Sequence, residues 1–81
     1  MLFQGDKMET RIRDLREDHD LTQTEVAEAI GITQRKYSYL ETGQQDWTDV
    51  LLVRLAAFYG TSVDYLLRQT DDPGPYPRSK K

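Results

Sequence analysis

The stretch from residue 23 to residue 42, QTEVAEAIGITQRKYSYLET, constrains the fold most, because it predicts two short helices that meet at a glycine. Thr22 stands three residues before Glu25, which is the capping-box spacing that opens a helix. Gly31 stands where the end of a helix favours a left-handed residue, a conformation that glycine adopts without strain. Between these two points runs an apolar stripe at helical spacing, formed by Val26, Ala29 and Ile30.

A second helix is predicted directly after this glycine. Thr33 can act as its N-cap, and Gly43 is expected to end it. Its apolar stripe begins at Tyr37 and Leu40. A connection this short makes the two helices cross steeply, and the single methyl group of Ala27 suits their closest approach. The stretch is therefore predicted to be a helix-turn-helix.

The outward face of the second helix carries side chains that can read DNA bases. If Tyr37 and Leu40 point inward, helical spacing turns the polar residues between them outward. Glutamine pairs with adenine and arginine with guanine in the major groove, where helix-turn-helix proteins place the start of this helix. The alternative is an ordinary solvated helix of a small bundle, which either feature alone would favour. We expect base contacts from Gln34, Arg35, Ser38 and Tyr39.

Residues 11–67 resemble the repressor/Cro-type helix-turn-helix family, also called the xenobiotic-response-element family. The resemblance implies an all-α fold, a compact five-helix bundle of the lambda-repressor type, within a DNA-binding transcriptional regulator. The segments that carry it, in the order and spacing of the family, are RIRDLRE at 11–17, LTQTEVAEAIGI at 21–32, YLETG at 39–43, LVRLAAFYG at 52–60 and TSVDYLL at 61–67.

The resemblance also implies particular contacts. Arg16 is expected to pair with Glu41, the alternative being two solvated charges. Gln23 is expected to anchor the DNA backbone, the alternative being that it only starts its helix. Tyr37 stands where the family mostly has Ile or Val, so the core must hold a ring whose hydroxyl needs a partner. The segment QQDW at 44–47 lacks the basic residues and the proline that the family often has there. The expected phosphate contacts are Thr22, Gln23, Thr33, Lys36 and Thr42.

Three further helices surround this motif in the prediction. The first runs from about residue 9 to residue 18, with Ile12 and Leu15 inward. Thr48 caps the fourth, Gly60 ends it, and Trp47 before the cap is expected to cover the edge of the core. The core stripe of the fourth helix is Leu52, Leu55, Ala56 and Tyr59, widened by Leu51 and Phe58. A short last helix, capped by Ser62, offers Val63, Leu66 and Leu67.

The chain divides into one domain and two flanking segments. Residues 8–68 form the predicted DNA-binding domain. Residues 1–7 are expected to be disordered, and LFQG within them resembles the remainder of a viral protease site left by recombinant expression. Residues 69–81 are expected to form a flexible tail, because three alternating prolines prevent a helix there.

The composition argues against several kinds of site. The chain of 81 residues has no cysteine and one histidine, so it lacks the ligands of thiolate or histidine-pair metal sites. Nothing in it resembles a phosphate-binding glycine loop or a nucleophile paired with a base. No apolar run reaches membrane-spanning length, and no secretory signal is present. We expect a cytoplasmic protein without enzymatic activity, cofactor, metal or membrane contact.

The net charge of −3 bears on DNA binding, because binding depends on neutralising phosphates. Acidic residues cluster at 17–20, 46–49 and 71–72, and Arg35 with Lys36 is the only adjacent basic pair within residues 8–68. A monomer with this surface is expected to bind double-stranded DNA weakly, since the local charge sets the field that DNA meets.

These features predict a repressor that acts as a homodimer on a pseudo-palindromic operator. The resemblance implies a dimer interface at the end of the fourth helix and in the fifth, which here places it at Phe58, Val63 and Tyr65. The alternative is that most of the aromatic rings in this region simply belong to the core. One alternative is an antitoxin-like module that uses the same fold and an acidic surface to bind a protein partner. Another is a fragment of a longer regulator.

Overall fold

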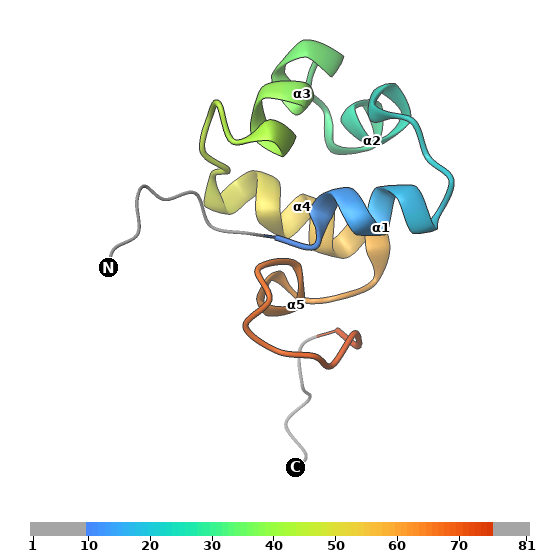
Figure 1. Ribbon diagram of the computed structural model, residues 1–81, viewed down its shortest axis with the longest axis vertical. Coiled ribbons are helices and arrows are strands. Elements are labelled where there is room, and N and C mark those ends of the chain that lie inside the picture. Colours follow the sequence, from blue (N-terminus) through green and yellow to red (C-terminus); the bar gives the residue numbers. More distant parts are fainter. Residues whose placement is uncertain (1–9, 76–81) are drawn as a thin grey trace.

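The computed structural model describes residues 10–75 and contains five helices in that range and no strand (Figure 1). The predicted all-α fold with five helices is therefore confirmed. The segment at residues 1–7, predicted to be disordered, lies outside the described residues. The helices are α1 (Ile12–Asp18), α2 (Gln23–Ile30), α3 (Gln34–Thr42), α4 (Asp49–Tyr59) and α5 (Val63–Leu66).

The helix-turn-helix forms one end of the molecule. Figure 1 shows α2 and α3 together at that end, α1 and α4 across the middle, and α5 at the opposite end. None of the helices in the described part of the chain is long and apolar enough to cross a membrane.

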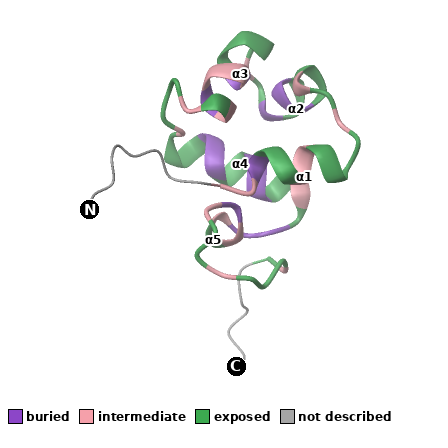
Figure 2. Cartoon of the chain, in the orientation of Figure 1, coloured by how far each residue is buried: buried purple, intermediate pink, exposed green. Residues whose placement is uncertain are grey.

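The core lies where α1, α2, α3, α4 and α5 converge. Tyr37 and Leu55 are fully buried. Figure 2 shows buried residues along α4, which crosses the middle of the molecule. Ala27 is fully buried on α2, as expected for the closest approach of the two motif helices. The buried cluster consists of Ile12, Val26, Ala27, Ile30, Tyr37, Leu52, Leu55, Ala56 and Leu66.

Ala29 corrects the predicted stripe of α2. It is exposed, whereas Val26, Ala27 and Ile30 are buried. At about 100° per residue, these three positions cluster on one side of the helix and Ala29 lies roughly 100° from their centre. The inward face of α2 is therefore centred between Val26 and Ala27 rather than toward Ala29.

The predicted caps of the motif are all present. Thr22 and Glu25 form a reciprocal capping box at the start of α2. The Thr33 hydroxyl accepts a hydrogen bond from the backbone N–H of Lys36 at 3.1 Å and so caps α3. Gly31 has a φ of 82°, the left-handed conformation expected at the junction of the two helices.

The first helix is shorter than predicted. It begins at Ile12, and Glu9, the expected start, lies outside the described residues. The backbone N–H of Arg11 donates to the carbonyl of Leu66 in α5 at 2.8 Å, so this residue is bound to another helix just before α1 begins.

The side chain of Arg11 holds the segment after α5 against α1. Its guanidinium lies 4.3 Å above the centre of the Tyr65 ring and donates to the carbonyl of Tyr65 at 2.8 Å. It also donates to the carbonyl of Thr70 and to the carboxylate of Asp71, each at 2.9 Å. The flexible tail predicted from Gln69 remains a prediction, but its first residues are hydrogen-bonded to the bundle.

Candidate nucleic-acid interface

The predicted base-reading residues lie on the outer side of α3. Gln34 and Arg35 are exposed in its first turn, and Ser38 and Tyr39 are half-buried one turn further on. Tyr37 and Leu40, between and beyond them, are buried. The helix therefore divides into an inward apolar side and an outward polar side, as its spacing predicted.

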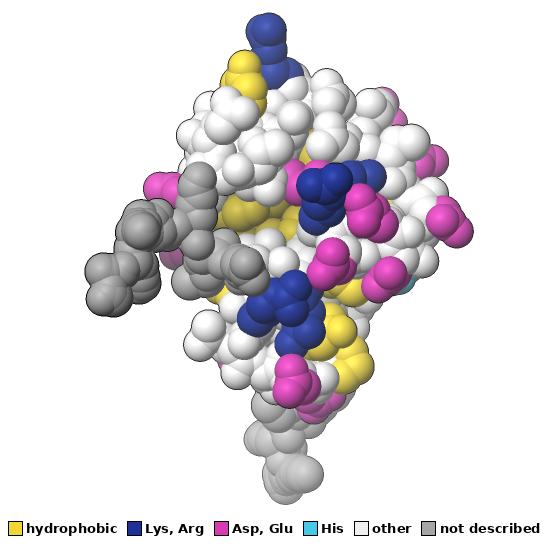
Figure 3. Space-filling model, in the orientation of Figure 1, with side chains coloured by type: hydrophobic (Ala, Val, Ile, Leu, Met, Phe, Trp, Pro, Cys, Tyr) yellow, Lys and Arg dark blue, Asp and Glu magenta, His cyan; other side chains and the backbone are white. Residues whose placement is uncertain are grey.

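Arg35 and Lys36 are the basic side chains available to an anion. Both are exposed, and within residues 10–75 neither side chain has a hydrogen bond or ion pair. Figure 3 shows a basic side chain projecting from the end of the molecule where α3 lies, away from the acidic side chains along the flank. The other basic side chains of the described range, each bonded to a carboxylate or a backbone carbonyl, are Arg11, Arg13, Arg16, Arg54 and Arg68.

Apart from Lys36, the predicted phosphate-contacting residues already make side-chain hydrogen bonds within the protein. The hydroxyls of Thr22 and Thr33 accept from backbone N–H groups as helix caps, and both residues are exposed. Thr42 is exposed at the end of α3, and its hydroxyl donates to the carbonyl of Ser38 at 2.9 Å. Gln23 is half-buried, with both ends of its amide in hydrogen bonds to other side chains.

Two glutamines connect the outer face of α3 to a buried carboxylate. Gln34 Nε2 donates to Gln23 Oε1 at 2.8 Å. Gln23 Nε2 in turn donates to Glu41 Oε1 at 3.0 Å. Gln34 is the first residue of α3, Gln23 is the first residue of α2, and Glu41 lies in the last turn of α3. The bonds therefore tie the two helices of the motif together beside the expected DNA contact.

Glu41 also receives the predicted partner from α1. Arg16 donates to it from Nε at 2.9 Å and from Nη2 at 3.1 Å, a bidentate pair, and Arg16 Nη1 donates to the carbonyl of Leu21. The two side chains are 14% and 4% exposed, so the pair is largely withdrawn from water. The Tyr37 hydroxyl donates to Glu41 Oε2 at 2.6 Å, which gives this core ring the partner that its position required.

These contacts shift the pKa values of the cluster. Burial acts to raise the pKa of Glu41, but hydrogen bonds from Arg16, Tyr37 and Gln23 outweigh it and leave the pKa below its ordinary value. Burial, and then the hydrogen bond to Glu41, raise the pKa of Tyr37. The hydrogen bond to Glu41 raises the pKa of Arg16. Glu41 is therefore a carboxylate, and its two neighbours keep their protons, at neutral pH.

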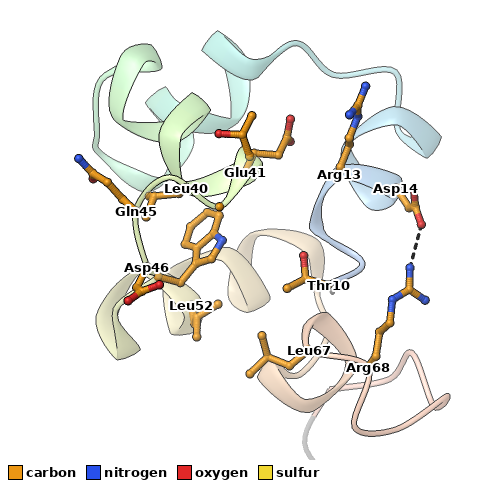
Figure 4. Close-up of a pocket in the computed structure, with 13 residues that line it drawn as sticks. Thr10, Arg13, Asp14, Leu40, Glu41, Gln45, Asp46, Leu52, Leu67 and Arg68 are labelled. Carbon is orange, nitrogen blue, oxygen red and sulfur yellow. Dashed lines mark hydrogen bonds and ion pairs between the residues drawn. The ribbon is translucent and has the colours of Figure 1, made fainter. Parts of the chain in front are cut away.

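A hollow of about 540 Å³ lies between α1, the end of α3 with the loop after it, and the residues that follow α5, and Glu41 is among the residues that line it. Leu40, Leu52 and Leu67 contribute apolar surface to it, and an ion pair of 3.1 Å between Arg68 and Asp14 lies at its edge (Figure 4). Among the predicted DNA-contacting residues, Thr42 alone lines it. No group of three or more His, Cys, Asp or Glu side chains within residues 10–75 could hold a metal ion.

The residues predicted for a dimer interface have different surroundings. Phe58 is 42% exposed and packs edge-on against Tyr59. Tyr65 is half-buried beneath the guanidinium of Arg11, and Val63 is half-buried against the core. Val50 and Val53 of α4 are more exposed than Phe58.

Sequence reasoning missed the glutamine bridge and the role of Arg11. The sequence did contain an indication of the hydrogen bond between Gln23 and Gln34. They are the first residues of the two motif helices, and these two positions lie close together in a helix-turn-helix. Arg11 gave no comparable signal, since its partners at residues 65, 70 and 71 lie at the other end of the chain.

Comparison with known proteins assigns the family. The helix-turn-helix family matches residues 12–66, which is more than half of the chain. The chain is 45% identical over 65 residues to the uncharacterized HTH-type transcriptional regulator YobD of Bacillus subtilis (strain 168), covering 80% of this chain and 58% of that protein.

A second relative is the cryptic phage CTXphi transcriptional repressor RstR of Vibrio cholerae. It is 37% identical over 62 residues, covering 76% of this chain and 56% of that protein. The chain thus matches a little over half the length of these curated relatives. No solved structure was found that matches it. The chain belongs to the Cro/C1-type helix-turn-helix family of DNA-binding transcriptional regulators.

Proposed function

We propose that this protein is a sequence-specific repressor that binds a pseudo-palindromic operator as a dimer. The proposal rests on the polar and basic side chains exposed at the start of α3. There Gln34 offers an exposed amide, and Arg35 and Lys36 are the basic side chains left unpaired within residues 10–75. An exposed arginine and glutamine at the start of the second motif helix are suited to guanine and adenine in the major groove.

In this proposal the base contacts come from Gln34, Arg35, Ser38 and Tyr39. Arg35 reads a guanine, because its guanidinium has no partner within the described residues that it would have to release. The amide of Gln34 reads an adenine. Ser38 and Tyr39, one turn further along the same side of α3, contact the bases or the groove wall beyond.

Phosphate contacts position the protein on the duplex without reading its sequence. Lys36 supplies a charge beside the base-reading residues. The start of α3, a helix of nine residues, directs its backbone N–H groups and positive dipole end toward the same surface. The remaining proposed contacts are Thr22, Gln23, Thr33 and Thr42.

A dimer compensates for the acidity of the chain. Two copies related by a two-fold axis double the phosphate contacts and set their α3 helices in successive major grooves, about 34 Å apart. The interface is proposed at Phe58, Val63 and Tyr65, of which Phe58 is the most exposed. Bound across a promoter, such a dimer represses by excluding polymerase or another regulator.

Electrophoretic mobility shift with two variants tests the proposal. Arg35→Ala is expected to cost about 1–3 kcal/mol of binding free energy and to relax discrimination at one base pair. Lys36→Ala serves as the matched control, because it removes a neighbouring charge and should weaken binding to all sequences alike. An Arg35→Ala variant that loses affinity equally on matched and scrambled DNA would refute the base-reading role. Absence of binding at low salt would instead favour the protein-interaction module.

A further inference from the structure

We propose that Glu41, whose side chain is buried in the last turn of α3, is a positioning residue that fixes the direction of the Gln34 amide and thereby its base preference. The inference rests on the proposed function. It means that a buried side chain of the helix-turn-helix contributes to the selectivity for DNA sequence. Glu41 itself is withdrawn from solvent and acts through Gln23.

The two carboxylate oxygens of Glu41 accept hydrogen bonds from four donor groups. Oε2 accepts from Arg16 Nε at 2.9 Å and from the Tyr37 hydroxyl at 2.6 Å. Oε1 accepts from Arg16 Nη2 at 3.1 Å and from Gln23 Nε2 at 3.0 Å. An ionised carboxylate accepts hydrogen bonds and cannot donate them. Each neighbour must therefore turn a donor toward it.

The need to turn a donor toward Glu41 fixes the direction of the Gln23 amide and, through it, that of the Gln34 amide. The two ends of a glutamine amide are nearly equal in shape, so its direction follows from its hydrogen-bond partners. Gln23 must direct its NH2 group to Glu41, which turns its Oε1 toward Gln34. Gln34 must then direct its own NH2 group to Gln23, as the 2.8 Å bond between them shows.

The Gln34 amide keeps one donor and one acceptor for DNA. One Nε2 hydrogen is used by Gln23, so the second Nε2 hydrogen and Oε1 are free for a base. Adenine offers an acceptor at N7 beside a donor at N6, which match this pair. An amide turned by 180° would present the donor and the acceptor in the opposite order along the groove. The direction set by Glu41 therefore determines whether the pair of bonds forms.

The rigidity of Glu41 makes it suited to this role. Arg16 holds it from α1, and Tyr37 holds it from one turn earlier on α3. Its pKa lies below the ordinary value, so it stays an acceptor at neutral pH. Gln23 and Gln34, by contrast, are half-buried and exposed, and side chains at such positions would otherwise change rotamer freely.

The test compares base preferences of variants on a duplex selected from a random DNA pool by the parent protein. The base pair read by Gln34 is first identified as the one at which Gln34→Ala loses discrimination. Glu41→Gln is expected to reduce discrimination at that pair by about 5- to 150-fold, the range of one bidentate contact. Discrimination at the pair read by Arg35 should not change. In a Gln34→Ala background, Glu41→Gln should have no further effect at the Gln34 pair.

Gln23→Ala gives the same test without disturbing the ion pair between Arg16 and Glu41. It removes the intermediate amide and is expected to produce the same loss at the same base pair. Ile12→Val is the matched control for lost stability, because it removes one methyl group from a fully buried side chain in α1. It should lower thermal stability while leaving every base preference unchanged.

A measurement without DNA separates this inference from the proposed function. In NMR spectra of the free protein, one side-chain amide proton of Gln34 should exchange slowly, and Gln23→Ala should abolish that protection. Equal loss of affinity on all sequences in Glu41→Gln, or an unchanged adenine preference in Gln23→Ala, would overturn the positioning role alone. A parent protein with no selective binding would refute the proposed function. Unprotected Gln34 amide protons in the parent would refute the bridge itself.

Discussion

Tyr37 places a phenol in the core, at a position where an unpaired hydroxyl would be costly to bury. The ring is fully buried and lies edge-on to Trp47, with 5.9 Å between ring centres. Its hydroxyl reaches Glu41, which is also bound by Arg16. One carboxylate therefore satisfies a buried phenol and a buried guanidinium, and it joins α1 to α3.

Removal of this hydroxyl should destabilise the domain while the ring remains. Tyr37→Phe is expected to lower the free energy of unfolding by about 1.5–3 kcal/mol, the usual contribution of a hydrogen bond to a charged group. Urea unfolding followed by circular dichroism measures the change. Tyr39→Phe is the control on the same helix, because no hydrogen bond of the Tyr39 hydroxyl occurs among the described residues. Equal stability of the two variants would contradict the account.

Acid should weaken the fold through Glu41. Its pKa in the folded protein lies below the ordinary value of 4.5, so its contribution to stability is fully present above that value. The contribution is lost as the pH falls through the lower folded pKa. Urea midpoints at a series of pH values should therefore fall in acid, and less steeply in Glu41→Gln than in the parent. A Glu41→Gln variant with the same slope as the parent would contradict this role of Glu41.

At the scale of single residues, the sequence predicted the contacts that follow from residue type or from the family resemblance. The ion pair between Arg16 and Glu41 followed from the family pattern, and the need of Tyr37 for a partner followed from its position. The bridge through Gln23 did not follow, because it depends on how closely the first turns of α2 and α3 approach. The packing of the whole motif sets this distance between the two helix starts, so no single residue type indicates it.

At the scale of helices, local chemistry defined the boundaries of α2, α3 and α4. Thr22, Thr33 and Thr48 cap three helices, and these helices end in left-handed glycines, namely Gly31, Gly43 and Gly60. Each of these signals acts within a few residues and so can be read from the sequence. The start of α1 could not be read in the same way, because Arg11 is bound to α5 across the fold.

The junction between α2 and α3 provides a test at this scale. Gly31→Val is expected to destabilise the domain by at least about 1–2 kcal/mol, because a β-branched residue adopts a positive φ only with strain. An added Cβ would lie 3.4 Å from Arg54 Nη1, an ordinary contact, so backbone strain is the main cost. Gly31→Asn should cost less, since asparagine tolerates this region. A thermal melt in which Gly31→Val equals the parent would contradict the argument.

At the scale of the whole molecule, the distribution of charge matters more than its sum. The net charge is −3, yet most basic side chains of residues 10–75 are used within the fold and Arg35 with Lys36 is left at one end. Sequence predicted this basic pair but not the pairing of the others, which joins residues far apart in the chain. Residues 10–75 of a single copy therefore offer few cations to DNA, which is the reason to expect two copies on an operator.

The dimer is tested by sedimentation of the free protein and of its DNA complex. Two chains per operator are expected, and Phe58→Glu should reduce the complex to one chain per site, because it places a charge in an apolar contact. Val50→Glu is the matched control, since it makes the same kind of exchange at an exposed apolar residue of α4 outside the proposed interface. A parent complex with one chain per site and an asymmetric footprint would rule the dimer out.

Selection of DNA from a random-sequence pool tests the central claim most directly, followed by affinity measurements on the selected duplex between about 50 and 200 mM salt. The account predicts enrichment of a pseudo-palindrome with half-sites about one helical turn apart, bound with a steep dependence on salt. It also predicts that Arg35→Ala shifts the preference at one position of each half-site. A pool that shows no enrichment even at low salt would contradict the assignment of a DNA-reading surface to α3.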